Sequence, residues 1–178
     1  MHKEYPLGHL AGLRITATPM AIIGALLLWA LLTLIGVRIL TMPVGVALAF
    51  GLIGSLLHYL SELIHNIGHS IAARRTSHPM TGVRLGTFLF FGTSLYPADE
   101  PPLPGKVHIR RALGGPIMNI LVGALFGALG LLLPASNGLL YALVWFLAID
   151  NLFILGLGAL LPLGFTDGST ILYWRGRA

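Results

Sequence analysis

The chain has no cysteine and very few charged residues among its 178 amino acids. The absence of cysteine excludes disulfide bonds and thiolate sites. Asp, Glu, Lys and Arg make up 10% of the sequence, against about 25% in a soluble domain, while hydrophobic residues reach 56%. Together with a mean hydropathy of +0.85, this composition excludes an ordinary soluble domain and predicts a polytopic membrane protein.

Four apolar stretches are each long enough to cross a bilayer, which takes about 20 helical residues. Prolines at positions 43, 134 and 162 mark the ends of three of them. We therefore predict an all-α polytopic membrane protein with four transmembrane helices in a single domain over residues 1–178. The predicted spans cover residues 20–40, 44–73, 112–133 and 139–161.

The net charge of +5 comes from basic residues that, apart from Arg38 near the end of the first span, lie outside the apolar stretches. They precede the first span, follow the fourth, and cluster between the second and third. By the positive-inside rule, both termini and this middle loop lie in the cytoplasm. Orientation in the lipid bilayer therefore accounts for the positive charge, and nucleic acid is not an expected partner.

The middle loop contains one segment with strand character. Residues 83–91 are rich in β-branched and aromatic side chains, with glycines close by, and predict a short strand or hairpin. A proline-rich linker follows at residues 96–104. The prediction is thus a short β segment within the cytoplasmic loop.

Four polar residues of the second span share one face of the helix. At 100° per residue, His58, Glu62, His65 and His69 fall within an arc of roughly 60°. Polar side chains are costly in lipid, so this face must meet the protein interior or a wet cavity. Two interpretations are open: a hydrogen-bonded stripe that joins helices, or a metal site built on the His65 and His69 pair, which lies four residues apart.

A third metal ligand is available just beyond the last span. Asp167 lies in the segment 160–169, where proline and glycine reverse the chain. Next to a glycine, this carboxylate can also be a turn residue or a helix cap. Two histidines and one carboxylate would leave one of the four positions of zinc for water, as catalytic zinc sites do.

Three motifs in order resemble the site-2 protease family of intramembrane zinc metalloproteases. Residues 65–69 are similar to its His-Glu-x-Gly-His motif, residues 115–119 to its Gly-Pro-x-x-Asn motif, and residues 160–168 to its Leu-Leu-Pro-x-Pro-x-Leu-Asp-Gly motif. The resemblance implies zinc held by His65, His69 and Asp167 within the membrane. It also implies that the middle-loop strand pairs with an extended substrate.

The chain departs from this family pattern at two positions. Asn66 stands where the family has the glutamate that takes a proton from zinc-bound water, and an amide cannot hold that proton. Ala159 stands where the family usually has an asparagine, although Asn119 remains and could do part of its work. Glu62, one turn before His65, could be a fourth ligand, a displaced base, a partner that orients an imidazole, or a buried carboxylate paired with His58 or an arginine.

These observations predict a zinc-binding homologue that is proteolytically impaired. It would serve as a structural or regulatory subunit that binds other membrane proteins in a prokaryotic cytoplasmic membrane. The first alternative is an active intramembrane metalloprotease that cleaves transmembrane substrates. The lesser alternative is a membrane subunit that carries haem or chlorophyll on His58 or His69.

Overall fold

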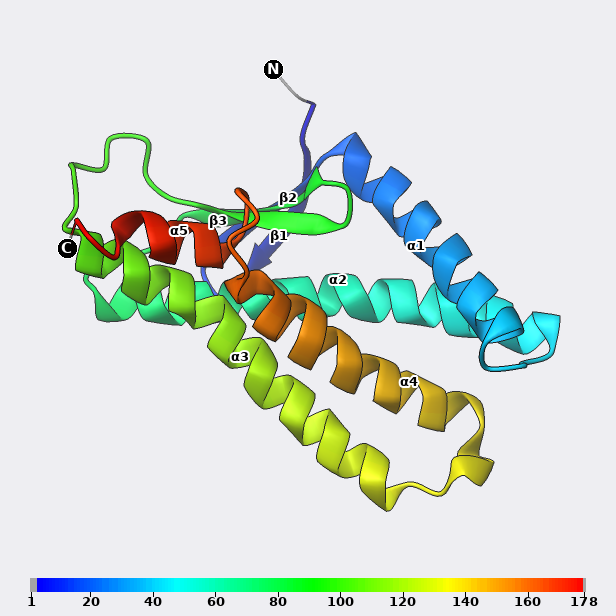
Figure 1. Cartoon of the computed structure of the whole chain (residues 1–178). Coiled ribbons are helices and arrows are strands. Elements are labelled where there is room, and N and C mark those ends of the chain that lie inside the picture. The colour runs from blue at the N-terminus through cyan, green and yellow to red at the C-terminus, as the bar shows by residue number, and fades with distance from the viewer. Residues whose placement is uncertain (1–2, 178) are drawn as a thin grey trace.

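The structure is a computed structural model that describes residues 3–177. Within this range, four helical segments are long and apolar enough to cross a membrane. Helix α2 lies between α1 on one side and the α3–α4 pair on the other, and a small sheet lies along one end of the helices (Figure 1). The predicted fold class, a four-span helical membrane protein with a small β segment, is confirmed.

The helices agree with the predicted spans at most of their ends. Helix α1 covers Pro19–Arg38, α2 covers Val44–Arg75 and α3 covers Gly105–Leu132. The fourth span covers Leu139–Leu160 and consists of α4 (Leu139–Ile149), a π-helical segment η2 (Asp150–Leu157) and a short 3-10 turn η3 (Gly158–Leu160). A last helix, α5, covers Asp167–Trp174.

Helix α3 begins seven residues before residue 112, the predicted start of the third span. Helix α3 begins at Gly105, directly after its N-cap residue Pro104. Its first two turns carry Lys106, Arg110 and Arg111, and these charges ended the apolar stretch on which the prediction rested. The chain is therefore helical before it reaches the apolar part of the span.

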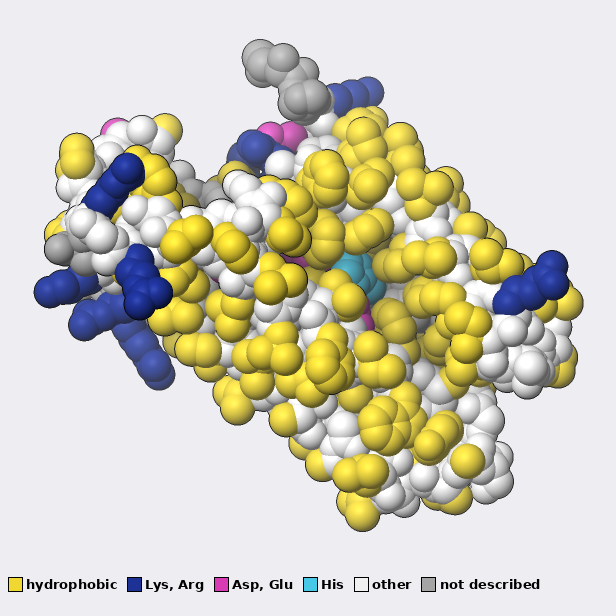
Figure 2. Space-filling view, in the orientation of Figure 1, with side chains coloured by type: hydrophobic (Ala, Val, Ile, Leu, Met, Phe, Trp, Pro, Cys, Tyr) yellow, Lys and Arg dark blue, Asp and Glu magenta, His cyan; other side chains and the backbone are white. Residues whose placement is uncertain are grey.

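The outward faces of the spans are covered by large apolar side chains, as expected for contact with lipid. Leu131 and Leu132 at the end of α3 are 78% and 81% exposed, and Figure 2 shows that hydrophobic side chains dominate one face of the molecule. Basic side chains gather at one end of this face, over the region where α3 begins and the chain ends (Figures 1 and 2).

The sheet has four strands in the order β1-β2-β3-β4. The expected hairpin is present as β3 (Gly82–Phe88) and β4 (Phe91–Leu95). A second hairpin, β1 (Tyr5–Leu10) and β2 (Leu13–Ala17), was not predicted from the sequence. Strand β2 pairs in parallel with β3, so the N-terminal segment and the middle loop form one unit.

The sheet packs against the ends of two helices. Leu13, Ile15, Val83 and Leu85 are buried in one cluster with Ala73 near the end of α2. This cluster fixes the β3–β4 hairpin over the C-terminal half of α2, which is the half that carries the histidine pair.

Helices α2 and α3 approach each other closely at a pair of glycines. A Cβ atom added to Gly68 would collide with the backbone oxygen of Gly114, and one added to Gly114 would collide with the oxygen of Gly68. Small residues at such crossings let helix backbones approach within lipid. The contact brings α3 against the part of α2 that carries His65 and His69.

We expect Gly68→Ala to destabilise the protein by about 1–3 kcal/mol, the usual effect of overpacking a close contact. Gly45 is the matched control, because it lies in the same helix and an added Cβ meets nothing within 4 Å. Gly45→Ala should be neutral or stabilise by up to about 1 kcal/mol. Unfolding midpoints of both variants in one detergent test this, and equal midpoints would contradict the close contact.

Candidate metal centre

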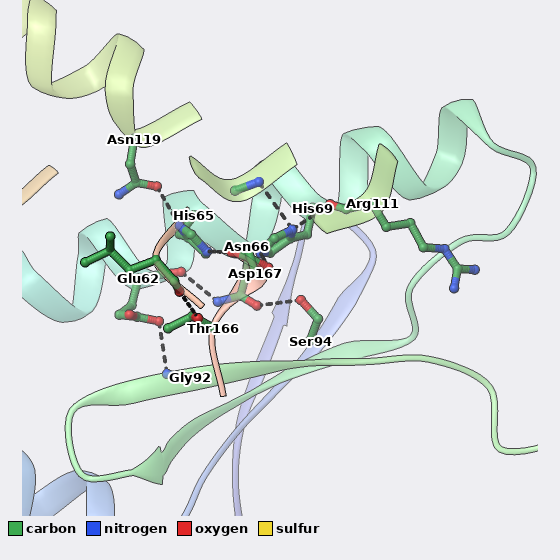
Figure 3. Close-up of polar contacts among 12 residues, drawn as sticks. Glu62, His65, Asn66, His69, Gly92, Ser94, Arg111, Asn119, Thr166 and Asp167 are labelled. Atoms are coloured by element: carbon green, nitrogen blue, oxygen red, sulfur yellow. Dashed lines mark hydrogen bonds and ion pairs between the residues drawn. The ribbon is translucent and has the colours of Figure 1, made fainter. Parts of the chain in front are cut away.

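Three candidate ligands from distant parts of the chain meet at one point. His65 Nε2 lies 3.1 Å from Asp167 Oδ2, and His69 Nε2 lies 3.4 Å from Asp167 Oδ1. One ligand atom from each of these residues lies within 4.8 Å of the other two. The helix spacing places both imidazoles on one face of α2, and the turn after η3 returns the chain so that α5 begins with the carboxylate (Figure 3).

The far nitrogen of each imidazole is held by a carbonyl oxygen of α3. Asn119 Oδ1 accepts from His65 Nδ1–H at 3.1 Å, and the backbone oxygen of Arg111 accepts from His69 Nδ1–H at 2.8 Å. In the tautomer with the hydrogen on Nδ1, the lone pair of each Nε2 is free. This is the arrangement in which histidines bind metals in proteins, with the outer hydrogen bond fixing tautomer and ring orientation.

The donor set fits zinc. Bond lengths of about 2.0–2.1 Å give a tetrahedral site ligand–ligand edges of about 3.3 Å, close to the 3.1 and 3.4 Å that separate Asp167 from the two imidazoles. Burial raises the pKa of Asp167, but the imidazoles in their protonated form outweigh it, through the charge on His69 and hydrogen bonds from both rings, and lower this pKa to about 2. The carboxyl group is therefore ionised, as a ligand must be.

Gly115 closes the centre from the side of α3. A Cβ atom on this residue would lie within 2.6 Å of His65 and would also collide with His69 Nε2. Any larger residue would therefore push the imidazoles away from their present positions. This close approach gives a physical reason for the glycine that begins the segment 115–119.

Asn66 lies beside the centre, and its amide forms hydrogen bonds within the protein. Its Nδ2 donates to the backbone oxygen of Glu62 at 2.9 Å, and its Oδ1 accepts from Ser94 Oγ at 2.9 Å (Figure 3). Glu62 is 3% exposed, and its Oε2 accepts from the backbone N–H of Gly92 at 3.0 Å. The β3–β4 hairpin thus binds Glu62, which precedes His65 by one turn, and Asn66, which follows it directly.

A cavity of about 680 Å³ opens next to the ligands. Its polar lining includes Glu62, Asn66, Ser94 and Asp167, and Ala159 also lines it. The position at which the family usually has an asparagine therefore faces the same space as the candidate ligands. A chain segment in this cavity would contact the ligands, the hairpin and η3 together.

Arg111 connects the metal centre to the proline-rich loop. Its guanidinium donates to both carboxylate oxygens of Glu100, at 2.9 and 2.5 Å, and to the backbone oxygen of His78 at 2.7 Å. These hydrogen bonds from Arg111 lower the pKa of Glu100. Because the backbone oxygen of the same arginine holds His69, anchoring the arginine also anchors a ligand.

A chain of amides behind His65 was not found from the sequence. Asn119 Nδ2 donates to Asn151 Oδ1 at 2.8 Å, and Asn151 Nδ2 donates to Ser61 Oγ at 2.8 Å. Both asparagines are 0% exposed. Asn119 thus contacts a ligand rather than open cavity, while Asn151 gave no signal beyond being a polar residue within an apolar span.

His58 does not join the candidate ligands, although it shares their face of α2. Its Nδ1 lies 3.0 Å from Asp150 Oδ1, and both side chains are buried. Asp150, from the fourth span, is thus the partner of His58. The polar stripe therefore divides into the His58 pair, the hairpin contact of Glu62, and the two imidazoles at the candidate metal centre.

Comparison with known proteins identifies relatives among metalloproteases. No protein-family model matches the chain. The chain is 30% identical to a Mycobacterium tuberculosis protein described as "Putative zinc metalloprotease Rip3", in strains Erdman and H37Rv, over 98% of this chain and 45% of that protein. It therefore spans about half the length of these curated relatives.

The fold is shared with a solved archaeal structure. The site-2 protease from Methanocaldococcus jannaschii superposes with a TM-score of 0.70 at 22% sequence identity. The superposition covers 96% of this chain and 70% of the archaeal one.

We expect purified protein to carry stoichiometric zinc that His65→Ala and Asp167→Asn lose, because the first change removes a nitrogen ligand and the second replaces the anionic carboxylate with a neutral amide. Elemental analysis measures the metal content directly. His9→Ala is the matched control, since His9 is exposed in β1, and it should retain zinc. Equal zinc contents in all four proteins would show that the metal binds elsewhere.

Removing the hydrogen bond behind His65 should weaken zinc without abolishing it. Asn119→Ala is expected to lower zinc affinity by about 10- to 100-fold, the usual effect of losing a partner that orients a ligand. Asn137→Ala, an exposed asparagine between α3 and α4, should leave affinity unchanged. Competition titration with a chelator measures both, and an unchanged affinity in Asn119→Ala would rule out this orienting role.

Proposed function

Because this chain belongs to the site-2 protease family, by sequence and by fold, we propose that it is a zinc-binding protein with impaired peptide cleavage. We propose further that it acts as a structural or regulatory subunit that binds other membrane proteins. Its relatives and its four apolar helices make it an integral membrane protein. The positions of its basic residues support an orientation with both termini and the middle loop in the cytoplasm of a prokaryotic cell.

The observation that carries this proposal is the identity and bonding of Asn66. Zinc would lower the pKa of a bound water to about 7. The proton of that water still needs an acceptor that can later donate it to the leaving amine. The amide of Asn66 cannot do this, and it already donates to the backbone oxygen of Glu62 and accepts from Ser94. A general base is typically worth about 10²- to 10⁴-fold in rate, so its loss supports slow cleavage.

Loss of cleavage would leave the binding surface intact. Strand β4 is an edge strand of the sheet, and its residues Gly92 to Ser94 line the cavity beside the candidate ligands. An edge strand offers free backbone groups to an extended segment. A site that holds an unwound segment of a membrane protein without cutting it would function as a docking site.

The principal alternative is an active protease that uses Glu62 as the base. Glu62 lines the same cavity as the ligands, and a hydrogen bond is assigned to only one of its carboxylate oxygens. Under this alternative the unmodified protein cleaves a single-span test substrate, and Glu62→Gln stops it. Under our proposal the unmodified protein is slow and Glu62→Gln changes little.

We expect Asn66→Glu to raise cleavage of a single-span test substrate by about 10²- to 10⁴-fold, because it restores a proton acceptor beside the candidate ligands. Asn66→Gln is the matched control, since it has the same length but no ionisable group. Cleavage is measured by gel analysis of substrate and protein in liposomes. Comparable rates for the unmodified protein and for Asn66→Glu would contradict impairment through this residue.

A further inference from the structure

Four exposed basic side chains gather at the end of the molecule where α3 begins and the chain ends (Figure 2). Lys106 and Arg110 lie one helical turn apart at the start of α3, and Arg175 and Arg177 lie just after α5. None of the four forms an ion pair with a carboxylate of residues 3–177. This basic group therefore presents positive charge that the described part of the chain does not neutralise.

The last turn of α5 exposes apolar side chains beside the basic group. Leu172 and Tyr173 are 59% and 57% exposed, and the guanidinium of Arg177 lies 4.0 Å from the centre of the Tyr173 ring. Tyrosine next to lysine or arginine is typical of the membrane interface, where the ring meets hydrocarbon and the cation meets headgroups. The apolar part of α3 begins within two residues of Arg110, so the basic group lies at the level of the headgroups.

Helix α5 connects the basic group to the candidate metal centre. It has eight residues and begins with the candidate ligand Asp167. At its other end the indole of Trp174 stacks on the imidazole of His108, with ring centres 4.4 Å apart and planes 5° apart. His108 belongs to the same first turns of α3 as Lys106 and Arg110. The ligand histidines thus hold one end of α5 and the start of α3 holds the other, so a contact that fixes the second end also restricts Asp167.

We propose that the basic group, with Leu172 and Tyr173, binds the headgroups of anionic phospholipids, and that this contact holds α5 with Asp167 at the two imidazoles. The effect on Asp167 rests on the proposed function, in which the chain binds zinc, whereas the lipid contact does not.

Charge and polarity together identify the membrane surface as the partner. Each lysine or arginine near an anionic membrane surface favours it by about 5-fold in affinity, and four such residues lie together here. An acidic protein segment would match the charges. A membrane surface also matches the exposed side chains of Leu172 and Tyr173, and it lies at this end of the spans in any case.

Thermal unfolding of the purified protein in a neutral detergent tests the lipid contact. The probes are phosphatidylglycerol and phosphatidylcholine, added at equal concentrations. We expect phosphatidylglycerol to raise the unfolding midpoint more, because a ligand that binds only the folded state stabilises it. Replacing two charges, by Arg175→Gln with Arg177→Gln, should increase the phosphatidylglycerol concentration needed for half of this rise by about 10- to 30-fold.

Three controls separate the headgroup contact from other effects. Arg175→Lys with Arg177→Lys keeps both charges and should keep the preference for phosphatidylglycerol. Arg38→Gln removes an exposed arginine at the C-terminal end of α1, at the opposite end of the spans (Figure 1), and should also keep it. Inorganic phosphate at the same concentration should not reproduce the rise, because it brings no hydrocarbon.

The effect on Asp167 is measured as zinc affinity in liposomes, by competition with a chelator. We expect phosphatidylcholine liposomes that contain phosphatidylglycerol to give a higher affinity than phosphatidylcholine alone, by up to about 10-fold, as for a contact that orients a ligand. The double glutamine variant should lose this difference. Both proteins meet the same accumulation of zinc at the anionic surface, so the comparison between them reports on the protein.

Equal stabilisation by the two lipids would overturn the lipid contact and leave an acidic protein segment as the partner of the basic group. A preference for phosphatidylglycerol that survives the double glutamine substitution would overturn it as well. Zinc affinity that is independent of lipid would overturn the effect on Asp167. Absent zinc with a clear preference for phosphatidylglycerol rejects the zinc-binding function and retains the lipid contact.

Discussion

Polar side chains within an apolar slab must find their partners inside the protein, and this requirement organises the packing around α2. The helix carries two imidazole ligand candidates, a buried glutamate and a further histidine on one face. Asn119 and the backbone oxygen of Arg111, both on helix α3, form hydrogen bonds with the two candidate ligands. From the fourth span, Asp150 forms a hydrogen bond with the further histidine, and Asn151 forms one with Asn119. Each of these contacts fixes the rotation of one helix relative to another, so the polar groups determine the packing while alkyl side chains face outward.

The candidate metal centre depends on backbone proximity as much as on its ligands. Gly68 and Gly114 let α2 and α3 touch, and Gly115 leaves room for the two imidazoles. The β3–β4 hairpin covers the third side, where it binds Glu62 and Asn66. Residue 66 therefore lies where α2 and the hairpin meet, directly beside the candidate ligands.

Much of the architecture could be predicted because lipid imposes simple rules. Apolar runs gave the four spans, and the four-residue spacing placed His65 and His69 together. Asp167 could be chosen only through resemblance to a family motif, since nothing local separates it from a turn residue. The start of α3 was missed because its first turns are charged, and the N-terminal hairpin because its strands are short. The division of the polar stripe could not be predicted, because Asp150 contacts His58 from the π-helical segment η2. Nothing in the sequence distinguishes this segment from a regular α-helix.

That segment, η2, has a consequence for how the sequence can change. A π-helical stretch typically accommodates one residue more than a regular helix of the same length, and here two consecutive side chains, Asp150 and Asn151, both turn inward to separate partners. Deleting one residue within η2 is absorbed by a return to the regular ladder, although Asp150 and Asn151 then no longer both turn inward. A deletion in the regular part of the span instead rotates everything after it by about 100°. The chain leading to Asp167 would then leave η3 in another direction. Insertions and deletions in this span are thus coupled to the register of a carboxylate that lies more than ten positions away.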